Sequence, residues 1–137
     1  MNDADFACDT DVLIEILRGD SRAGEWLSTI ESLVIGIPVI VWMEILMGAR
    51  DKQEQRTFAE LLAQYPILHF EAGDSERARQ WFGEFHLSHG VGILDCLIAA
   101  IAFCLRKPFY TFNLKHFQII RVIDVQAPYV RMQRGRS

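Results

Sequence analysis

Short apolar runs alternate along this chain with longer segments in which apolar residues recur every three or four positions. The short runs are typical of strands buried on both faces inside a parallel sheet. The longer segments have the periodicity of a helix with one buried face. These patterns predict strands at 6–8, 33–36, 67–70, 109–111 and 119–125, and helices at 12–18, 22–32, 38–47, 53–65, 74–90 and 94–106.

Proline and glycine mark the ends of several predicted helices. Pro38 suits the first position of a helix, where its missing N–H is not needed. Gly48 and Gly90 lie where two helices should stop, and Pro66 and Pro108 cannot continue the helices before them. The predicted order is therefore one of strands separated by helices.

This order predicts an α/β fold with a mostly parallel central sheet between two layers of helices. The 137 residues suit a single domain spanning 1–137, since no repeat or linker divides them. A short tail at about 131–137 contains three arginines and no acid.

Composition excludes several classes of protein. Half of the residues are hydrophobic and 23% are charged, so the chain can form a core. No apolar run is long enough to cross a bilayer, and the acidic N-terminus is unlike a secretory leader, so we expect a cytoplasmic protein without a membrane partner. The three cysteines form no close pair, which argues against both a disulfide framework and a zinc site.

Five side chains with oxygen ligands are expected near one edge of the sheet. Asp9 and Asp11 follow the first strand, and Asn113 follows the fourth. Glu44 is the only charge in the run VIVWMEILMG, and Asp95 is the only charge in VGILDCLIAAIAFCL. Ligands bind where parallel strands end, and hard divalent cations prefer oxygen donors. The pattern favours a site for Mg²⁺ or Mn²⁺.

Each of these residues also has an ordinary structural explanation. Asp9 and Asp11 suit the cap and first turn of a helix, and Asp95 suits a helix N-terminus. Glu44 would be unremarkable if it faced solvent, and Asn113 if it lay in a turn. Their coincidence is what favours a functional site, because an ionised carboxylate among apolar residues is costly unless paired or bound to a metal.

Four segments resemble, in order, the four motifs of PIN domains: CDTDVLIEILRG, VWMEILMGAR, ILDCLIAAIAF and YTFNLKHFQII. The compact length and the opening segment are most similar to the VapC-type toxin ribonucleases of toxin–antitoxin pairs. The resemblance implies a three-layer α/β/α PIN-like fold and a Mg²⁺- or Mn²⁺-dependent endoribonuclease that cleaves RNA with metal-activated water. It also implies a cognate antitoxin protein and a homodimer.

The resemblance further implies roles for individual residues. Asp9, Glu44 and Asp95 match the acidic, metal-binding core of the catalytic site. Asn113 matches the fourth catalytic position, which is often aspartate in the family.

Three further residues are expected to support the site. Thr111 matches a polar residue of the fourth motif, and His116 stands where many relatives carry an acid. Asp11 replaces the usual asparagine or serine, and either adds a ligand or orients its neighbours. Asparagine and histidine in the fourth motif weaken the ligand set, so that the site would bind one metal ion or hold a second one weakly.

Lysines and arginines near the mouth of the site are expected to contact RNA. Arg50, Lys52, Lys115 and the arginine tail are the candidates, although each is also an ordinary surface charge. The net charge of −4 counts against binding of nucleic acid by charge alone. A bound dication would offset two of these negative charges.

Three alternatives remain open from the sequence. Asp9 and Asp11 resemble the opening motif of haloacid-dehalogenase-type phosphatases, but Leu13 stands where that motif has threonine or valine. A receiver domain would need a phosphoacceptor aspartate after a middle strand, which the segment ILHFEAGDS does not supply. A catalytically inactive PIN-like interaction module is the third alternative.

Overall fold

A computed structural model of the chain describes residues 4–131. In this range strands and helices alternate as the sequence predicts. The elements are β1 (Phe6–Cys8), α1 (Thr10–Leu17), α2 (Ser21–Thr29), β2 (Ile35–Pro38), α3 (Val39–Met47), α4 (Lys52–Leu62), β3 (Ile67–Leu68), α5 (Asp74–His89), α6 (Ile93–Leu105), β4 (Phe109–Tyr110), α7 (Leu114–Phe117) and β5 (Val125–Gln126).

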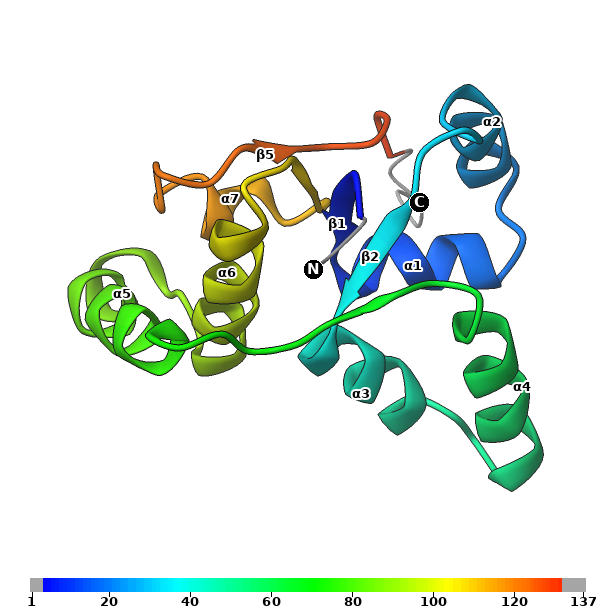
Figure 1. Cartoon of the computed structure of the whole chain (residues 1–137), viewed down its shortest axis with the longest axis horizontal. Coiled ribbons are helices and arrows are strands. Elements are labelled where there is room, and N and C mark those ends of the chain that lie inside the picture. Colours follow the sequence, from blue (N-terminus) through cyan, green and yellow to red (C-terminus); the bar gives the residue numbers. More distant parts are fainter. Residues whose placement is uncertain (1–3, 132–137) are drawn as a thin grey trace, which may run out of the picture.

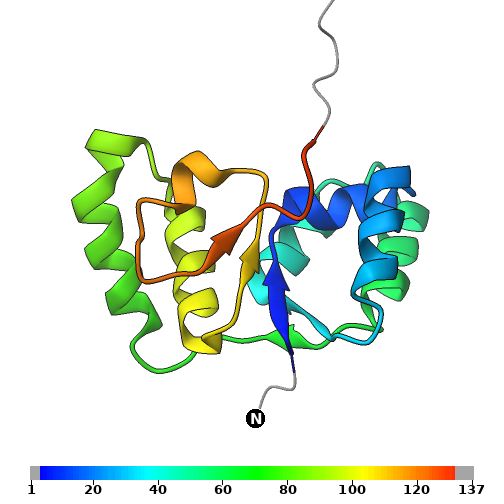
Figure 2. The same ribbon diagram turned by 90° about the horizontal axis from the view of Figure 1, so that it is seen from above.

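The sheet has five strands in the order β3-β2-β1-β4-β5, and all of its pairings are parallel. Ala7 at the centre of β1 pairs with Gly36 on one side and Phe109 on the other. Helices α5 and α6 lie on one side of the sheet and α1 to α4 on the other (Figures 1 and 2). The predicted three-layer α/β/α fold with a parallel sheet is therefore confirmed.

The core forms where the central strands meet α6. Every residue of β1 and β2 is buried, as a strand covered by helices on both faces requires. Helix α6 is buried on all sides through its middle, since the five consecutive residues from Ile98 to Ala102 are all buried. The three cysteines are free, and Cys8 and Cys96 are buried as small core residues. Within residues 4–131, none of the helices is long and apolar enough to span a bilayer.

The second strand begins two residues later than the sequence suggests. Leu33 and Val34 are 45% and 39% exposed, and the strand covers Ile35–Pro38. Pro38 has the extended backbone of a strand end (φ −55°, ψ 139°) and precedes α3, so its prediction as the first helical residue is wrong. An apolar run alone does not reveal which of its residues pair with the neighbouring strand.

The C-terminal part of the fold differs most from the prediction. The expected strand at 119–125 is only Val125–Gln126, because the chain before it forms turns closed by backbone bonds from Ile120 to Phe117 and from Ile123 to Ile120. Ile120 and Ile123 are buried from within these turns. The short helix α7, which directly follows Asn113, is not predicted at all.

We expect Gly36→Ala to destabilise the protein by about 1–3 kcal/mol. A Cβ atom at Gly36 would lie 2.8 Å from the Cβ of Ala4 and 2.9 Å from Cγ and Cδ1 of Leu68, inside the core. Urea denaturation measures the loss. Gly24→Ala in α2 is the matched control, because a Cβ there meets nothing within 4 Å. Equal stability of the two variants would contradict the close packing at Gly36.

Candidate active site

Asp9 links the ends of two neighbouring strands. It directly follows β1 and caps α1, where its Oδ1 accepts a hydrogen bond from the N–H of Thr10 at 2.8 Å. Its Oδ2 accepts a hydrogen bond from the hydroxyl of Thr111, just after β4, also at 2.8 Å. The side chain is nearly buried, with 8% of its surface exposed. Asp9 is therefore both a helix cap and a fixed carboxylate at the carboxyl edge of the sheet.

Glu44 is joined to Asp9 through Thr10. Glu44 lies in α3 and is half-buried, and its Oε1 accepts a hydrogen bond from the Thr10 hydroxyl at 2.5 Å. The same threonine therefore binds Asp9 with its N–H and Glu44 with its hydroxyl. A Glu44 that simply faces solvent does not match this geometry. Thr10 is not among the predicted site residues, although its place between two aspartates indicates such a role.

Asp95 reaches the site from the N-terminal turn of α6. Its Oδ2 accepts a hydrogen bond from the N–H of Gly92 at 3.0 Å, so the ordinary role at a helix start is also present. The Nδ1 atom of His116 lies 3.2 Å from the same oxygen. That nitrogen is also 3.1 Å from Nδ2 of Asn113. Asp95 is thereby connected to the residues that follow β4.

The chain of contacts continues from Asn113 back to Asp9. The N–H of Asn113 donates to the hydroxyl oxygen of Thr111 at 3.0 Å, and Thr111 donates to Asp9. The structure thus joins the four residues predicted to be catalytic, and two of the three predicted to support them, into one set. We call this set the acidic network, and its members are Asp9, Thr10, Glu44, Asp95, Thr111, Asn113 and His116.

Asp11 lies beside the acidic network and is not a member of it. Its Oδ2 accepts a hydrogen bond from the N–H of Phe112 at 3.2 Å, which holds the start of α1 against the chain after β4. Its Oδ1 is buried and has no hydrogen-bond partner within residues 4–131. An unpaired buried carboxylate oxygen is costly unless a cation or water binds it.

Burial and neighbouring charges disfavour the ionised form of these aspartates. Burial, then the charge of Asp11, raise the pKa of Asp9 to about 7, and Glu44 adds a smaller effect in the same direction. Hydrogen bonds from Thr111 and Thr10 oppose this shift without cancelling it. Burial also raises the pKa of Asp11. A group of carboxylates held close together in this way is expected where a cation binds.

A family model described as the PIN domain matches residues 6–116. The chain belongs to the PIN domain family. The matched range contains every member of the acidic network. Membership leaves the phosphatase and receiver-domain alternatives without support.

Curated relatives agree with this assignment. Ribonuclease VapC10 of Mycobacterium tuberculosis is 33% identical over 111 residues, which cover 80% of this chain and 83% of the relative. The predicted resemblance to VapC-type PIN proteins is therefore confirmed.

Solved structures share the whole fold. A toxin–antitoxin complex from Klebsiella pneumoniae contains a chain that is 25% identical, with a TM-score of 0.72 over 90% of this chain and 98% of that one. VapBC-1 from nontypeable Haemophilus influenzae contains a chain that is 20% identical, with a TM-score of 0.74 over 90% of this chain and 97% of that one. At 20% identity, the similarity to the Haemophilus influenzae structure shows a shared PIN fold alone.

The donor atoms of this PIN site suit a hard divalent cation. Asp9, Glu44 and Asp95 offer only carboxylate oxygens, and the unpaired Oδ1 of Asp11 lies at the same edge of the sheet. Within residues 4–131, no three acidic, histidine or cysteine side chains are already close enough to enclose one ion. The residues therefore fit the metal by the chemistry of their oxygen donors.

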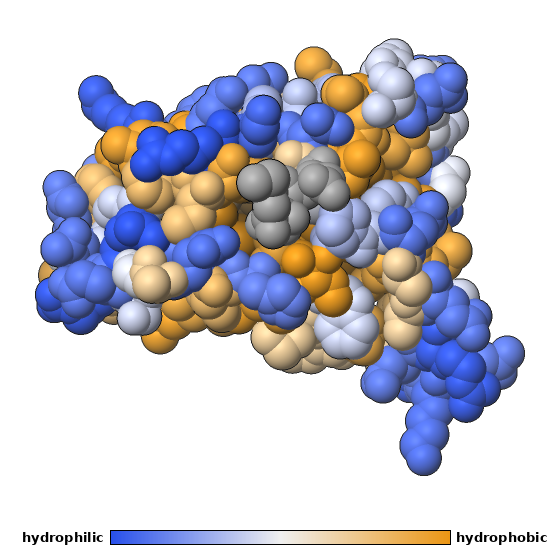
Figure 3. Space-filling model, viewed as in Figure 1, coloured by the Kyte–Doolittle hydropathy of each residue, from blue (hydrophilic) through white to orange (hydrophobic). Residues whose placement is uncertain are grey.

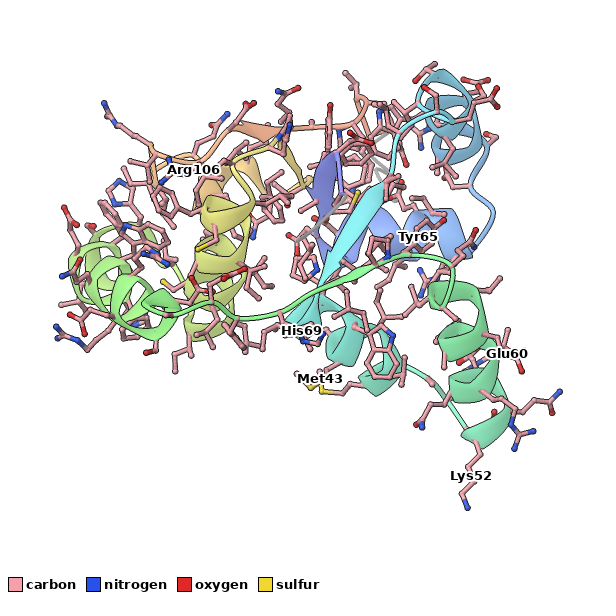
Figure 4. All side chains as sticks on the ribbon, viewed as in Figure 1. Met43, Lys52, Glu60, Tyr65, His69 and Arg106 are labelled. Carbon is pink, nitrogen blue, oxygen red and sulfur yellow. The ribbon has the colours of Figure 1, made fainter. Side chains whose placement is uncertain are left out.

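The residues predicted to contact RNA lie in different places, and Arg131 of the tail pairs with Glu15 of α1. Lys115 is exposed on α7, next to His116. Arg50 is exposed and pairs with Glu54 at 2.9 Å, whereas Lys52 projects from the end of α4 (Figure 4). Figure 3 shows that this end of the molecule is strongly hydrophilic.

Arg50 also lines a groove of about 500 Å³ between α1, α3 and α4. The other residues of this groove are Ile14, Leu17, Arg18, Ile45, Gly48, Glu54 and Phe58. Of the predicted contacts to RNA, only Lys115 is adjacent in sequence to a member of the acidic network. Residues 132–137, with the remaining tail arginines, lie outside the described part of the chain.

Proposed function

We propose that this PIN protein is a Mg²⁺- or Mn²⁺-dependent endoribonuclease and the toxin of a toxin–antitoxin pair. One observation carries the proposal: Asp9, Glu44 and Asp95 belong to one network of contacts at the carboxyl edge of the sheet. In the sequence, 35 residues separate Asp9 from Glu44 and 51 residues separate Glu44 from Asp95. The name of the curated relative, a ribonuclease, supports the same activity.

In this proposal Asp9, Glu44 and Asp95 hold the metal ion. The ion, when bound, lowers the pKa of a water molecule and neutralises charge on the scissile phosphate. Hydrogen bonds already fix one oxygen of Glu44, through Thr10, and one oxygen of Asp95, through Gly92. The second oxygen of each carboxylate stays available as a ligand.

Asn113 and His116 then position the acids instead of adding a carboxylate ligand. His116 lies against the oxygen of Asp95 that Gly92 already binds, and its Nδ1 is 3.1 Å from Nδ2 of Asn113. The backbone N–H of Asn113 donates to the Thr111 hydroxyl oxygen, and Thr111 in turn donates to Asp9. Asn113 and His116 stand where many relatives of the family carry further acids, so we expect the site to bind one metal ion, or to hold a second one weakly. Fixed ligands reduce the reorganisation needed during the reaction.

Several further properties follow from the proposal. Similar solved structures are described as toxin–antitoxin or VapBC complexes, so we expect a protein antitoxin as the partner of this chain. We also expect a homodimer that acts on RNA in the cytoplasm.

Removing divalent metal is expected to reduce RNA cleavage by at least about 10³-fold, since a catalytic ion supplies several kcal/mol of transition-state stabilisation. Purified protein is incubated with total RNA in Mn²⁺, in Mg²⁺ or in excess chelator, and the new 5′ ends are mapped. Internal cuts that carry 5′-phosphates and require the metal would support the proposal. Equal cleavage with chelator, or no cleavage under any condition, would contradict it.

A further inference from the structure

The segment 127–131, which we call the C-terminal arm, crosses over the start of α1 (Figure 2). Glu15 of α1 binds two of its residues. The Tyr129 hydroxyl donates to Oε1 of Glu15, and Nη1 of Arg131 donates to Oε2 at 3.1 Å. Burial and the Glu15 carboxylate raise the pKa of Tyr129, so its hydroxyl remains a donor at neutral pH. These contacts give the arm a defined place on the surface.

A second helix also holds the arm. Nη1 of Arg22 in α2 donates to the carbonyl oxygen of Val130 at 3.2 Å. The guanidinium of Arg22 lies 5.8 Å from the centre of the Tyr129 ring. The arm is therefore attached through both side chains and backbone, which limits how far Arg131 can move.

Phe112 connects the arm to the acidic network. Its ring packs edge-on against Tyr129, with centroids 5.1 Å apart, and the guanidinium of Arg131 lies 4.3 Å from its centre. Phe112 stands between Thr111 and Asn113, both members of the acidic network, and its N–H donates to Asp11. Arg131 is thus a cation held beside the acidic network.

This combination suits the backbone of single-stranded nucleic acid. Proteins that bind single-stranded nucleic acid use two kinds of side chain: cations contact the phosphates, and aromatic rings lie close to them. The side chain of Arg131 is 45% exposed, and within residues 4–131 only Glu15 accepts a hydrogen bond from it, so several guanidinium donors face outward. A chain of net charge −4 needs such a local cation to bring a phosphate toward its acids.

We propose that the C-terminal arm is a binding site for single-stranded RNA, in which Arg131 contacts a backbone phosphate beside the cleavage site. Glu15 positions Arg131 by accepting its hydrogen bond, and the rings of Phe112 and Tyr129 pack together beneath its guanidinium. The inference rests on the proposed ribonuclease function for its substrate, but it concerns binding and is tested without cleavage.

The test uses a non-cleavable 2′-O-methyl oligoribonucleotide of about 12 nucleotides, which is within the span of known single-strand sites. Its Kd is measured at several salt concentrations for the wild type and for Arg131→Gln. One lost phosphate contact lowers the slope of log Kd against log salt by about 0.7. We expect this change, together with a loss of affinity of about tenfold at low salt.

Arg121→Gln is the matched control, because Arg121 is an exposed arginine between α7 and β5. It should leave the salt slope unchanged although it removes the same charge. Arg131→Lys keeps the charge and should keep the slope, which separates a phosphate contact from general loosening of the arm. Thermal melts of all variants check the fold.

Outcomes of binding and of cleavage are separable. If the slope of log Kd against log salt falls in Arg131→Gln but not in Arg121→Gln, the arm is supported as the RNA site. This holds even if the wild type cleaves no RNA and the proposed function fails. Identical slopes for Arg131→Gln and Arg121→Gln, or no binding of the oligonucleotide by the wild type, would overturn the inference even if RNA is cleaved.

Discussion

Asp95→Asn is expected to reduce metal-dependent RNA cleavage by about 10³-fold and to leave the fold intact. Loss of one fixed charge at a catalytic centre typically costs about 10²–10³-fold, and loss of a direct metal ligand belongs at the upper end. Asparagine can still accept the hydrogen bond from Gly92, because it retains one side-chain oxygen. The helix start is therefore preserved, whereas the negative ligand is lost.

Single-turnover cleavage of an RNA substrate in Mn²⁺ measures this effect, and thermal melting checks the fold. Asp124→Asn is the matched control, since it makes the same chemical change at an exposed aspartate outside the acidic network. Its cleavage rate should equal that of the wild type. Wild-type activity in Asp95→Asn would remove Asp95 from the proposed metal site.

The order of strands and helices was predictable because the spacing of apolar residues in the sequence follows the positions that each strand or helix buries. Strands β1 and β2 are buried on both faces and read as continuous apolar runs, while α6 shows its long apolar face. The region of Ile119 to Ile123 has the same apolar content but forms turns. Its buried isoleucines pack inward without strand pairing, and apolar content alone does not distinguish these two cases.

The members of the candidate site were predictable in part. Glu44 and Asp95 are anomalous because each is the only charge in an apolar run, and Asp9 follows the first strand. Asn113 follows the fourth strand, and the resemblance to PIN motifs added Thr111 and His116.

The connections among these residues were not predictable, because they depend on side-chain orientation after folding. Nothing in the sequence shows that Thr10 joins Asp9 to Glu44, or that Glu15, over 110 residues from Tyr129, holds the C-terminal arm. Such contacts arise between segments brought together only by the sheet. They are also the contacts on which the proposed positioning of the acids depends.

Asp9→Asn is expected to stabilise the metal-free protein by about 2–4 kcal/mol at pH 8. Folding raises the pKa of Asp9 to about 7, whereas the unfolded chain has the ordinary value of about 3.9. Between these values the unfolded state loses its proton and the folded state keeps it, so stability falls as the pH rises. Above about pH 7 the folded protein carries the full cost of the buried charge. Asparagine avoids that cost and can still cap α1.

Urea denaturation in chelator at pH 5 and pH 8 measures this effect. The advantage of Asp9→Asn over the wild type should grow by roughly 2–3 kcal/mol between these two values, because the pKa difference spans this range. Asp51→Asn is the matched control, because Asp51 is also the N-cap of a helix, α4, but is exposed. The stability of this variant should stay within about 0.5 kcal/mol of the wild type at both pH values. An Asp9→Asn protein no more stable than the wild type at pH 8 would contradict the charge crowding at this site.

Adding Mn²⁺ reverses the expected order of stability. An ion that binds only the folded protein stabilises it according to its concentration and affinity. The wild type should therefore gain stability with Mn²⁺, while Asp9→Asn, which lacks one negative ligand, gains much less. The buried charge of Asp9 thus lowers the stability of the metal-free protein and also provides its affinity for the metal. A wild-type melting temperature that does not rise with Mn²⁺ would contradict metal binding at Asp9, even if Asp9→Asn stabilises the metal-free protein.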